Sequence, residues 1–150
     1  MLTQLSVFGQ SEEPKILKVV NDLFLAMKTN DGSLAASLFT DDAILQTIIT
    51  REDSVYIQSS NTTTLVDAFG KPKEQTWSEP IWNTKVLMDG SLATVWTDYA
   101  FYFGNQFSHC GVDVFHLVKT DSGTWKIFHL VDTRRKKDCD IPKDIVSQYR

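Results

Sequence analysis

Apolar residues recur at helical spacing near the start of the chain. The positions that fit one face of a helix are Ile16, Val19, Val20, Leu23, Phe24 and Met27. Ser11 and Pro14 precede this run as start signals, and a polar turn at residues 30–32 ends it. The pattern predicts an amphipathic helix of about four turns that begins at Ser11, and residues 33–39 predict a short second helix.

Strand patterns dominate the rest of the chain. β-Branched residues predict strands at 43–50 and 54–58, and residues 61–69 predict a third helix capped by Asn61 or Thr62. Longer runs typical of strands follow at residues 80–88, 92–103, 107–119 and 124–133. Turn sequences separate these runs, and short turns join antiparallel neighbours. Helices followed by such a meander indicate an α+β fold with helices on one face of an antiparallel sheet, and residues 141–150 suit a terminal helix.

Composition narrows the class of protein. A chain of 150 residues with 42% hydrophobic content suits one domain over residues 1–150. The net charge of -4 predicts no nucleic-acid partner and no membrane partner, and the basic run at 134–137 reads as a solvated strand end. The first residues lack the pattern of a leader, and no apolar run reaches the roughly 20 residues of a membrane span. A cytoplasmic protein is expected, or a periplasmic or secreted one if a leader was removed.

The cysteines and the known catalytic motifs add few constraints. Cys110 and Cys139 have neither CxxC nor metal-like spacing, so both are predicted to be free thiols. The sequence contains no nucleotide-binding loop, no nucleophile elbow and no metal motif. We therefore predict no cofactor and no metal site.

The run FSHCGVDVFHLVK at residues 107–119 carries unusual residues on one side. Side chains alternate across a strand, so one face presents Cys110, Val112, Val114, His116 and Val118. The other face presents His109, Gly111, Asp113, Phe115 and Leu117. This mixture of titratable and aromatic groups around a glycine fits either a solvated surface or the wall of a pocket.

Several stretches together resemble the nuclear transport factor 2-like superfamily. They are SLFTDDA after the second helix, the hairpin at residues 104–105, and GVDVFHLVKTDSGTWKI. The resemblance implies a curved sheet wrapped around helices as a cone with an internal pocket. Members include ketosteroid isomerases, SnoaL-like cyclases, scytalone dehydratases and non-catalytic binding domains, so the fold does not determine the function.

Residues matched to the isomerases argue against isomerase chemistry by that family's mechanism. The general base would fall on Thr47 and the oxyanion-hole tyrosine on Leu23, and neither residue can serve. Only the Asp-x-Phe pattern of the second oxyanion group has a counterpart, in Asp113 and Phe115.

The resemblance also implies which face of each strand meets the pocket. It turns Asp113 toward the cavity. Strand pairing around the turns then predicts which residues of the neighbouring strands also face the cavity: Trp96, Asp98, Ala100 and Tyr102 on the preceding strand, and Phe128, Leu130 and Asp132 on the last strand. Opposed side chains lie within about 4.5–5.5 Å at Cβ. Asp98, Asp113 and Asp132 are therefore expected to cluster around Gly111, with His109 nearby.

Two kinds of role follow for these residues. The candidate catalytic residues are Asp113, His109 and Asp132, because carboxylates and an imidazole crowded into an aromatic-lined hollow repel and desolvate one another, which raises some acid pKa values. The candidate ligand-binding residues are Trp96, Asp98, Tyr102, Phe115, Phe128 and Leu130. The alternative is that Asp98 and Asp132 form solvated ion pairs with Arg134, Arg135 or Lys126 at the rim.

Three functions remain open from the sequence. The first is a domain that binds a small hydrophobic or aromatic molecule in the pocket. The second is a SnoaL-like cyclase, isomerase or dehydratase that uses Asp113 with His109 or Asp132 as acid and base. The third is an interaction module, because both faces of the strands are apolar and a homodimer would cover the convex face. The residues predicted for that interface are Val95, Tyr99, Phe101, Val112, Val114, His116 and Ile127.

Overall fold

The computed structural model describes the backbone of residues 8–150 and the side chains from Glu12 onward. The predicted cap at Ser11 lies outside the described side chains. The elements in chain order are α1 (Phe8–Thr29), α2 (Gly32–Ser37), β1 (Phe39–Arg51), β2 (Ser54–Asn61), α3 (Thr62–Gly70), β3 (Trp77–Ser78), β4 (Ile81–Asp89), β5 (Leu92–Phe103), β6 (Gln106–Lys119), β7 (Trp125–Thr133) and α4 (Lys143–Gln148).

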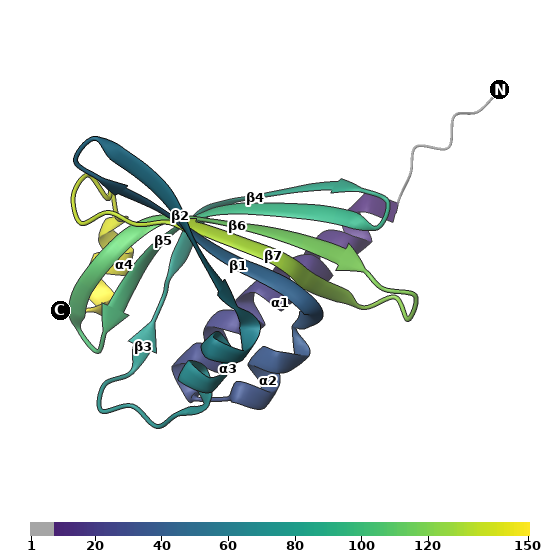
Figure 1. The fold of residues 1–150 in the computed structure, drawn as a ribbon, viewed down its shortest axis with the longest axis horizontal. Coiled ribbons are helices and arrows are strands. Elements are labelled where there is room, and N and C mark those ends of the chain that lie inside the picture. Colours follow the sequence, from purple (N-terminus) through teal and green to yellow (C-terminus); the bar gives the residue numbers. More distant parts are fainter. Residues whose placement is uncertain (1–7) are drawn as a thin grey trace.

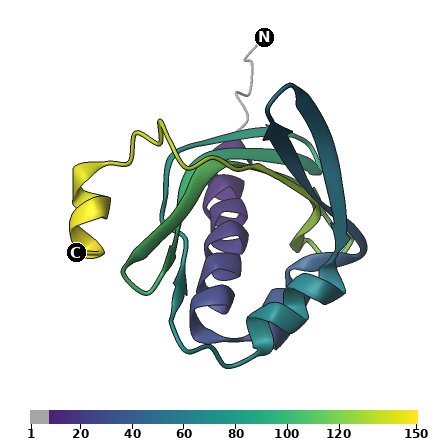
Figure 2. The same cartoon turned by 60° about the vertical axis from the view of Figure 1, so that its left-hand side comes forward.

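The strands form one curved, open sheet around the long first helix. Figure 2 shows α1 inside the curve, α2 and α3 across one end, and α4 outside the sheet. The strand order is β2-β1-β7-β6-β5-β3, with β4 also paired to β5 (Figure 1). The predicted α+β fold is confirmed, but the sheet is mixed because β1 runs parallel to β7. A parallel neighbour was possible because one helix and five strands separate β1 from β7 in the chain.

The helices end and begin where the sequence supplies caps. The Asp31 side chain accepts from Leu34 N at 2.8 Å at the start of α2, and the Asn61 side chain accepts from Thr64 N at 3.0 Å at the start of α3. The apolar face of α1 then packs on the concave side of the sheet. The fully enclosed residues of this core include Ile16, Val20, Ala26, Val95, Phe115, Leu117 and Ile127.

A β-bulge changes the face that β5 presents to the interior. At the turn, Phe103 pairs with Gln106 as the hairpin predicts, but beyond it Phe101 pairs with His109, so Ser108 is an extra residue in β6. One extra residue exchanges inner and outer positions along the partner strand. Thr97 rather than Trp96 therefore lies opposite Asp113. The odd-numbered side chains of β5 therefore face the cavity, and the prediction that the even-numbered ones do so is wrong.

A second bulge lies in β7. His116 pairs with His129, but Leu117 pairs with Ile127, so Phe128 is the extra residue. Phe128 stacks on His116 on the outer face, with ring centroids 6.0 Å apart. Ile127 consequently turns inward and is fully buried.

These bulges also correct the predicted dimer surface. Four of its residues belong to the protein's own core and are no more than 8% exposed: Val95, Tyr99, Phe101 and Ile127. Val112, Val114 and His116 do lie on the outer face, where they are half-buried.

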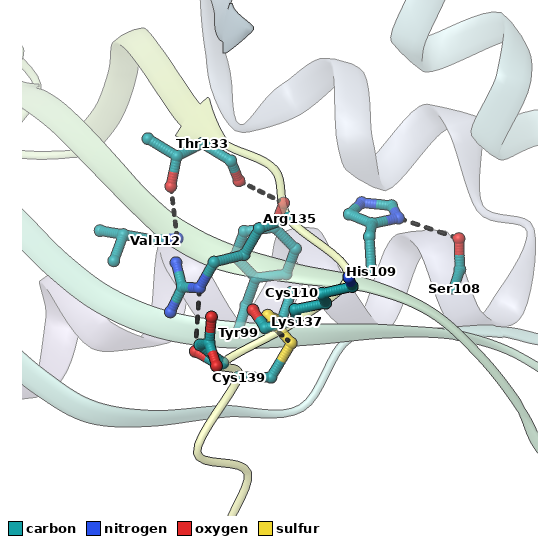
Figure 3. The surroundings of a disulfide bond; sticks show 10 residues. Tyr99, Ser108, His109, Cys110, Val112, Thr133, Arg135, Lys137 and Cys139 are labelled. Atoms are coloured by element: carbon teal, nitrogen blue, oxygen red, sulfur yellow. Dashed lines mark hydrogen bonds between the residues drawn. A yellow bond between two sulfur atoms is a disulfide. The ribbon is translucent and has the colours of Figure 1, made fainter. Parts of the chain in front are cut away.

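The C-terminal segment covers one end of the outer face. Cys110 and Cys139 form a disulfide, with Cα atoms 5.8 Å apart, which corrects the prediction of two free thiols (Figure 3). The segment pairs with β6, because Cys110 N donates to Arg135 O at 2.9 Å. The Tyr102 and Tyr149 rings stack at 3.9 Å. Tyr102 is therefore buried beneath α4, outside the curve of the sheet.

Among residues 8–150, no helix combines the length and the apolar character needed to cross a membrane.

Candidate functional site

A cavity of about 480 Å³ lies between the helices and the concave face of the sheet. Its helical wall is apolar, with Leu23, Phe24 and Met27 from α1 and Leu65, Ala68 and Phe69 from α3. Its polar end brings together Glu79, Tyr99, His109, Asp113, Asp132 and Arg134. An apolar enclosure with a few convergent polar groups is the usual form of a small-molecule site.

Glu79 and Asp113 form a carboxyl pair at this polar end. Asp113 is 4% exposed, and its Oδ2 atom has no N–H or hydroxyl partner among the described residues. The carboxyl group of Glu79 is its close neighbour, and two carboxyl groups so placed cannot both ionise cheaply in a buried site, so one of them keeps a proton. Burial and the Asp132 charge raise the pKa of Glu79 to about 7, and burial with the nearby Glu79 raises the pKa of Asp113 well above its ordinary value.

Asp132 is held by donors from three directions. Its Oδ1 accepts from Thr47 Oγ1 at 2.6 Å, since Thr47 and Asp132 pair across the parallel β1–β7 ladder. Its Oδ2 accepts from Tyr99 OH at 3.2 Å and from Arg134 Nε at 2.7 Å. The rim ion pair with Arg134, which the sequence left open as the alternative for Asp132, is the arrangement that the structure shows.

Tyr99 joins the polar end to the backbone of β7. Its one hydroxyl hydrogen is shared between Thr133 O at 2.8 Å and, as the longer contact, Asp132 Oδ2 at 3.2 Å, and burial raises the pKa of this phenol, so it stays protonated. The Thr133 carbonyl fits only because residue 111 is glycine, since a Cβ there would lie 1.9 Å from Thr133 O. The space at Gly111 is thus filled by Thr133 and Tyr99, and no acidic cluster surrounds it.

His109 faces the cavity as a neutral side chain. Its ring stacks on Phe101 at 5.2 Å, and its Nδ1 atom hydrogen-bonds with Ser108 Oγ at 2.9 Å (Figure 3). Burial, together with the nearby Arg134 charge, lowers the pKa of His109 to about 4. At neutral pH His109 therefore carries no charge and acts as a hydrogen-bonding group.

The structure brings only some of the predicted site residues to the cavity. Asp113, His109, Asp132 and Leu130 line it. Phe115 faces inward but lies below the cavity in the core, where its ring contacts Phe24 edge-on at 6.0 Å.

The remaining predicted residues lie elsewhere because of the bulges. Trp96 is 51% exposed on the outer face, and Asp98 accepts from Asn83 Nδ2 at 2.8 Å there, since both have the parity opposite to Thr97. Phe128 is the bulged residue of β7, and Tyr102 lies under α4.

Sequence reasoning missed Glu79 and Tyr99 as site residues. Glu79 follows the two-residue strand β3 and precedes Pro80, in a segment with no periodic pattern to orient it. The sequence predicts Tyr99 on the outer face, and this is wrong because the bulge at Ser108 turns it inward. Among the residues with described side chains, no group of three or more His, Cys, Asp or Glu is arranged to hold a metal ion.

Comparison with known proteins identifies the fold. No protein-family model matches the chain, and no curated protein matches it. An NTF2-like protein of unknown function from Shewanella baltica is 14% identical with a TM-score of 0.67, over 88% of this chain and 100% of that one. A protein from Streptomyces avermitilis, provisionally named a dehydratase of the NTF2-like family, is 13% identical with a TM-score of 0.65, over 85% and 98%.

A third similar structure comes from an enzyme assembly. It is the β subunit of a provisionally named aromatic-ring-hydroxylating dioxygenase from Novosphingobium aromaticivorans, 13% identical with a TM-score of 0.69, over 85% of this chain and 91% of that one. Together these structures confirm the nuclear transport factor 2-like resemblance at the level of the fold, which is also called cystatin-like. Their differing descriptions assign no common activity.

Proposed function

We propose that this protein binds a small molecule with an apolar body and one hydrogen-bonding group. The observation that carries the proposal is the Glu79–Asp113 carboxyl pair in a cavity whose helical wall is apolar. When both carboxyls are protonated, one proton bridges the pair and the other is free to be donated to a carbonyl or hydroxyl of the ligand. The volume of about 480 Å³ accommodates a bicyclic aromatic molecule.

The test uses the uncharged, solvatochromic ketone 6-propionyl-2-dimethylaminonaphthalene as a probe. We expect saturable binding with a blue shift, because the probe leaves water for the apolar wall formed by α1 and α3. Ala68→Trp fills the cavity and is expected to weaken binding by about tenfold or more. Thr94→Trp, which adds the same side chain to the outer face, is the matched control. Absence of saturable binding, or equal binding by Ala68→Trp, would contradict the proposal.

A second candidate function is proton transfer next to a carbonyl group. It is favoured by the pKa of Glu79 of about 7, which is suited to an acid or base at neutral pH. In this version Glu79, once ionised, removes an α-proton while Asp113 donates to the carbonyl oxygen, giving an enol. This replaces His109 and Asp132 as partners of Asp113, because His109 is neutral and Asp132 is occupied by Arg134.

The second candidate can be tested without knowing the natural substrate. In D2O, an enolising enzyme would exchange the acetyl protons of 2-acetylnaphthalene for deuterons, which proton NMR follows directly. We expect exchange faster than in buffer for the wild type and none above buffer for Glu79→Gln. If the protein binds 2-acetylnaphthalene but does not accelerate the exchange, the result supports the binding function and contradicts the enzymatic one.

The disulfide bears on where the protein acts. Disulfides persist in oxidising compartments and are rare in the cytosol. The Cys110–Cys139 bond therefore favours the periplasmic or secreted alternative over the cytoplasmic one.

A further inference from the structure

Arg134 lies at the solvent-exposed edge of the polar end of the cavity, beside a fixed counter-charge. Its side chain is 55% exposed, and it is the one lysine or arginine among the described residues that line the cavity. An arginine in such a place would ordinarily receive an anionic ligand through its planar array of donors. Here its Nε atom donates instead to Asp132 Oδ2 at 2.7 Å, and its terminal nitrogen approaches Thr47 Oγ1 at 3.4 Å.

The counter-charge is fixed in place independently of Arg134. Asp132 is 14% exposed and accepts from Thr47 on β1 and Tyr99 on β5, so its carboxylate cannot swing away when a ligand arrives. Thr47 pairs directly with Asp132 across the sheet, and Tyr99 is itself anchored on Thr133 O. An anion reaching Arg134 would therefore meet an immobile negative charge beside it, and deeper in the cavity it would meet the Glu79–Asp113 acids.

We propose that Asp132 is the specificity-determining residue that neutralises the charge of Arg134 and so restricts the cavity to uncharged ligands. This inference rests on the proposed binding function and adds the class of ligand. Asp132 acts on the ligand through Arg134, so it is a positioning residue and not a catalytic one.

The experiment compares matched probes that differ in charge. 2-Acetylnaphthalene is uncharged, 2-naphthoate is an anion of nearly the same shape, and 2-naphthylmethylammonium is a cation. Each is measured by displacement of the solvatochromic ketone at pH 6.5 from the full chain. The quantity compared is the ratio of dissociation constants on one protein, so a general weakening of the cavity by a substitution cancels.

Opposite substitutions should shift the preference in opposite directions. The wild type is expected to bind the ketone at least about tenfold more tightly than the naphthoate, since a charged group that enters unpaired loses its hydration. Asp132→Asn releases Arg134 and should improve the naphthoate relative to the ketone by about tenfold. Arg134→Gln leaves Asp132 without its partner and should improve the ammonium relative to the ketone, and the double variant should lose both gains.

The outcomes separate this inference from the function on which it rests. Equal binding of ketone and naphthoate by the wild type overturns the charge selection while the binding function stands. The charge selection is also overturned if Asp132→Asn has the same ratio of naphthoate to ketone dissociation constants as the wild type, provided that circular dichroism shows the variant to be folded. If that variant does not fold, the Arg134→Gln ratio decides, and an unchanged ratio overturns the inference. Failure of the wild type to bind any probe contradicts the binding function, and the inference falls with it.

Discussion

Glu79 and Asp113 bring their carboxyl groups together at the polar end of the cavity, where burial raises the pKa of both. The two residues are far apart in the chain, since Glu79 follows β3 and Asp113 lies in the middle of β6. Two carboxyl groups in contact cannot both ionise cheaply in a desolvated site. The pair therefore loses a proton near neutral pH. The effect of this proton loss on stability and its effect on ligand binding can be measured separately.

The first prediction concerns stability and pH. The pKa of Glu79 is raised from 4.5 to about 7, so the folded protein keeps a proton that the unfolded chain releases. This contribution is present in full below about pH 4.5 and is lost as the pH rises through 7, at a total cost of about 3 kcal/mol. Glu79→Gln should remove it, so that the variant gains free energy of unfolding relative to the wild type at pH 8 but not at pH 4.5.

Urea unfolding at the two pH values gives this difference directly. The exposed Glu74→Gln is the matched control, and it should follow the wild type at both. Parallel pH profiles for the wild type and Glu79→Gln would show that Glu79 has an ordinary pKa.

The second prediction concerns Gly111. A methyl group at this position would lie 1.9 Å from Thr133 O, so Gly111→Ala must displace the end of β7 and break the bond from Tyr99 to that carbonyl. Overpacking of this kind costs about 1–3 kcal/mol or more. Thermal unfolding should show the loss, whereas Gly70→Ala, whose added Cβ meets nothing nearer than 3.5 Å, should change little. Equal melting temperatures for the two variants would contradict the close approach.

The third prediction concerns the disulfide. The bond closes a loop with a sequence separation of 29 residues, and its loss should cost about 3–4 kcal/mol by the chain-entropy relation. Cys139→Ser should lower the melting temperature, and dithiothreitol should lower that of the wild type but not that of the variant. A thiol assay on the unreduced, denatured wild type should find no free thiol. Two free thiols would instead support the original expectation from cysteine spacing.

The fourth prediction concerns the outer face, for which we propose a homodimer interface away from α4. Large apolar side chains remain exposed there, namely Ile44, Leu87, Leu92 and Trp96. Several large apolar side chains exposed on one face are typical of an interaction site. Trp96→Glu should give a monomer by light scattering, whereas Tyr56→Glu, on the opposite face of the β1–β2 hairpin, should leave the dimer intact. A monomeric wild type at micromolar concentration would contradict the proposal.

The sequence was sufficient for most of the elements and for four residues of the cavity, namely Asp113, His109, Asp132 and Leu130. Helical spacing located α1 because a long periodic run with a clear stop has few alternatives, and the turn sequences separated β4 to β7. Alternation within one strand, oriented by the superfamily resemblance, correctly turned Asp113 inward. Within an uninterrupted strand, the face of one side chain determines the faces of all the others, because successive side chains alternate.

What failed was the transfer of parity between strands. Ser108 and Phe128 are ordinary residues in their runs, yet each inserts one position, so that the inward-facing parity predicted from the turn is wrong for β5 and for the start of β7. No local signal marks such a bulge, so Trp96 and Asp98 were expected inside and Tyr99 outside. Glu79 and the pairing of Cys139 escaped for a related reason: both lie in irregular segments whose positions only the tertiary structure defines.

The most direct test of the central claim is the pH dependence of ketone binding at the carboxyl pair. Below pH 7 both carboxyl groups are protonated, so one proton can be donated to the ligand oxygen. Above pH 7 only one proton remains, and it is shared between Glu79 and Asp113. The dissociation constant of 2-acetylnaphthalene should therefore be constant from pH 5 to 6.5 and rise toward tenfold by pH 8.5, because one hydrogen bond to the ligand is lost. Glu79→Gln, whose amide donates at every pH, should show a flat profile. A flat profile for the wild type, or the same rise in Glu79→Gln, would contradict the account.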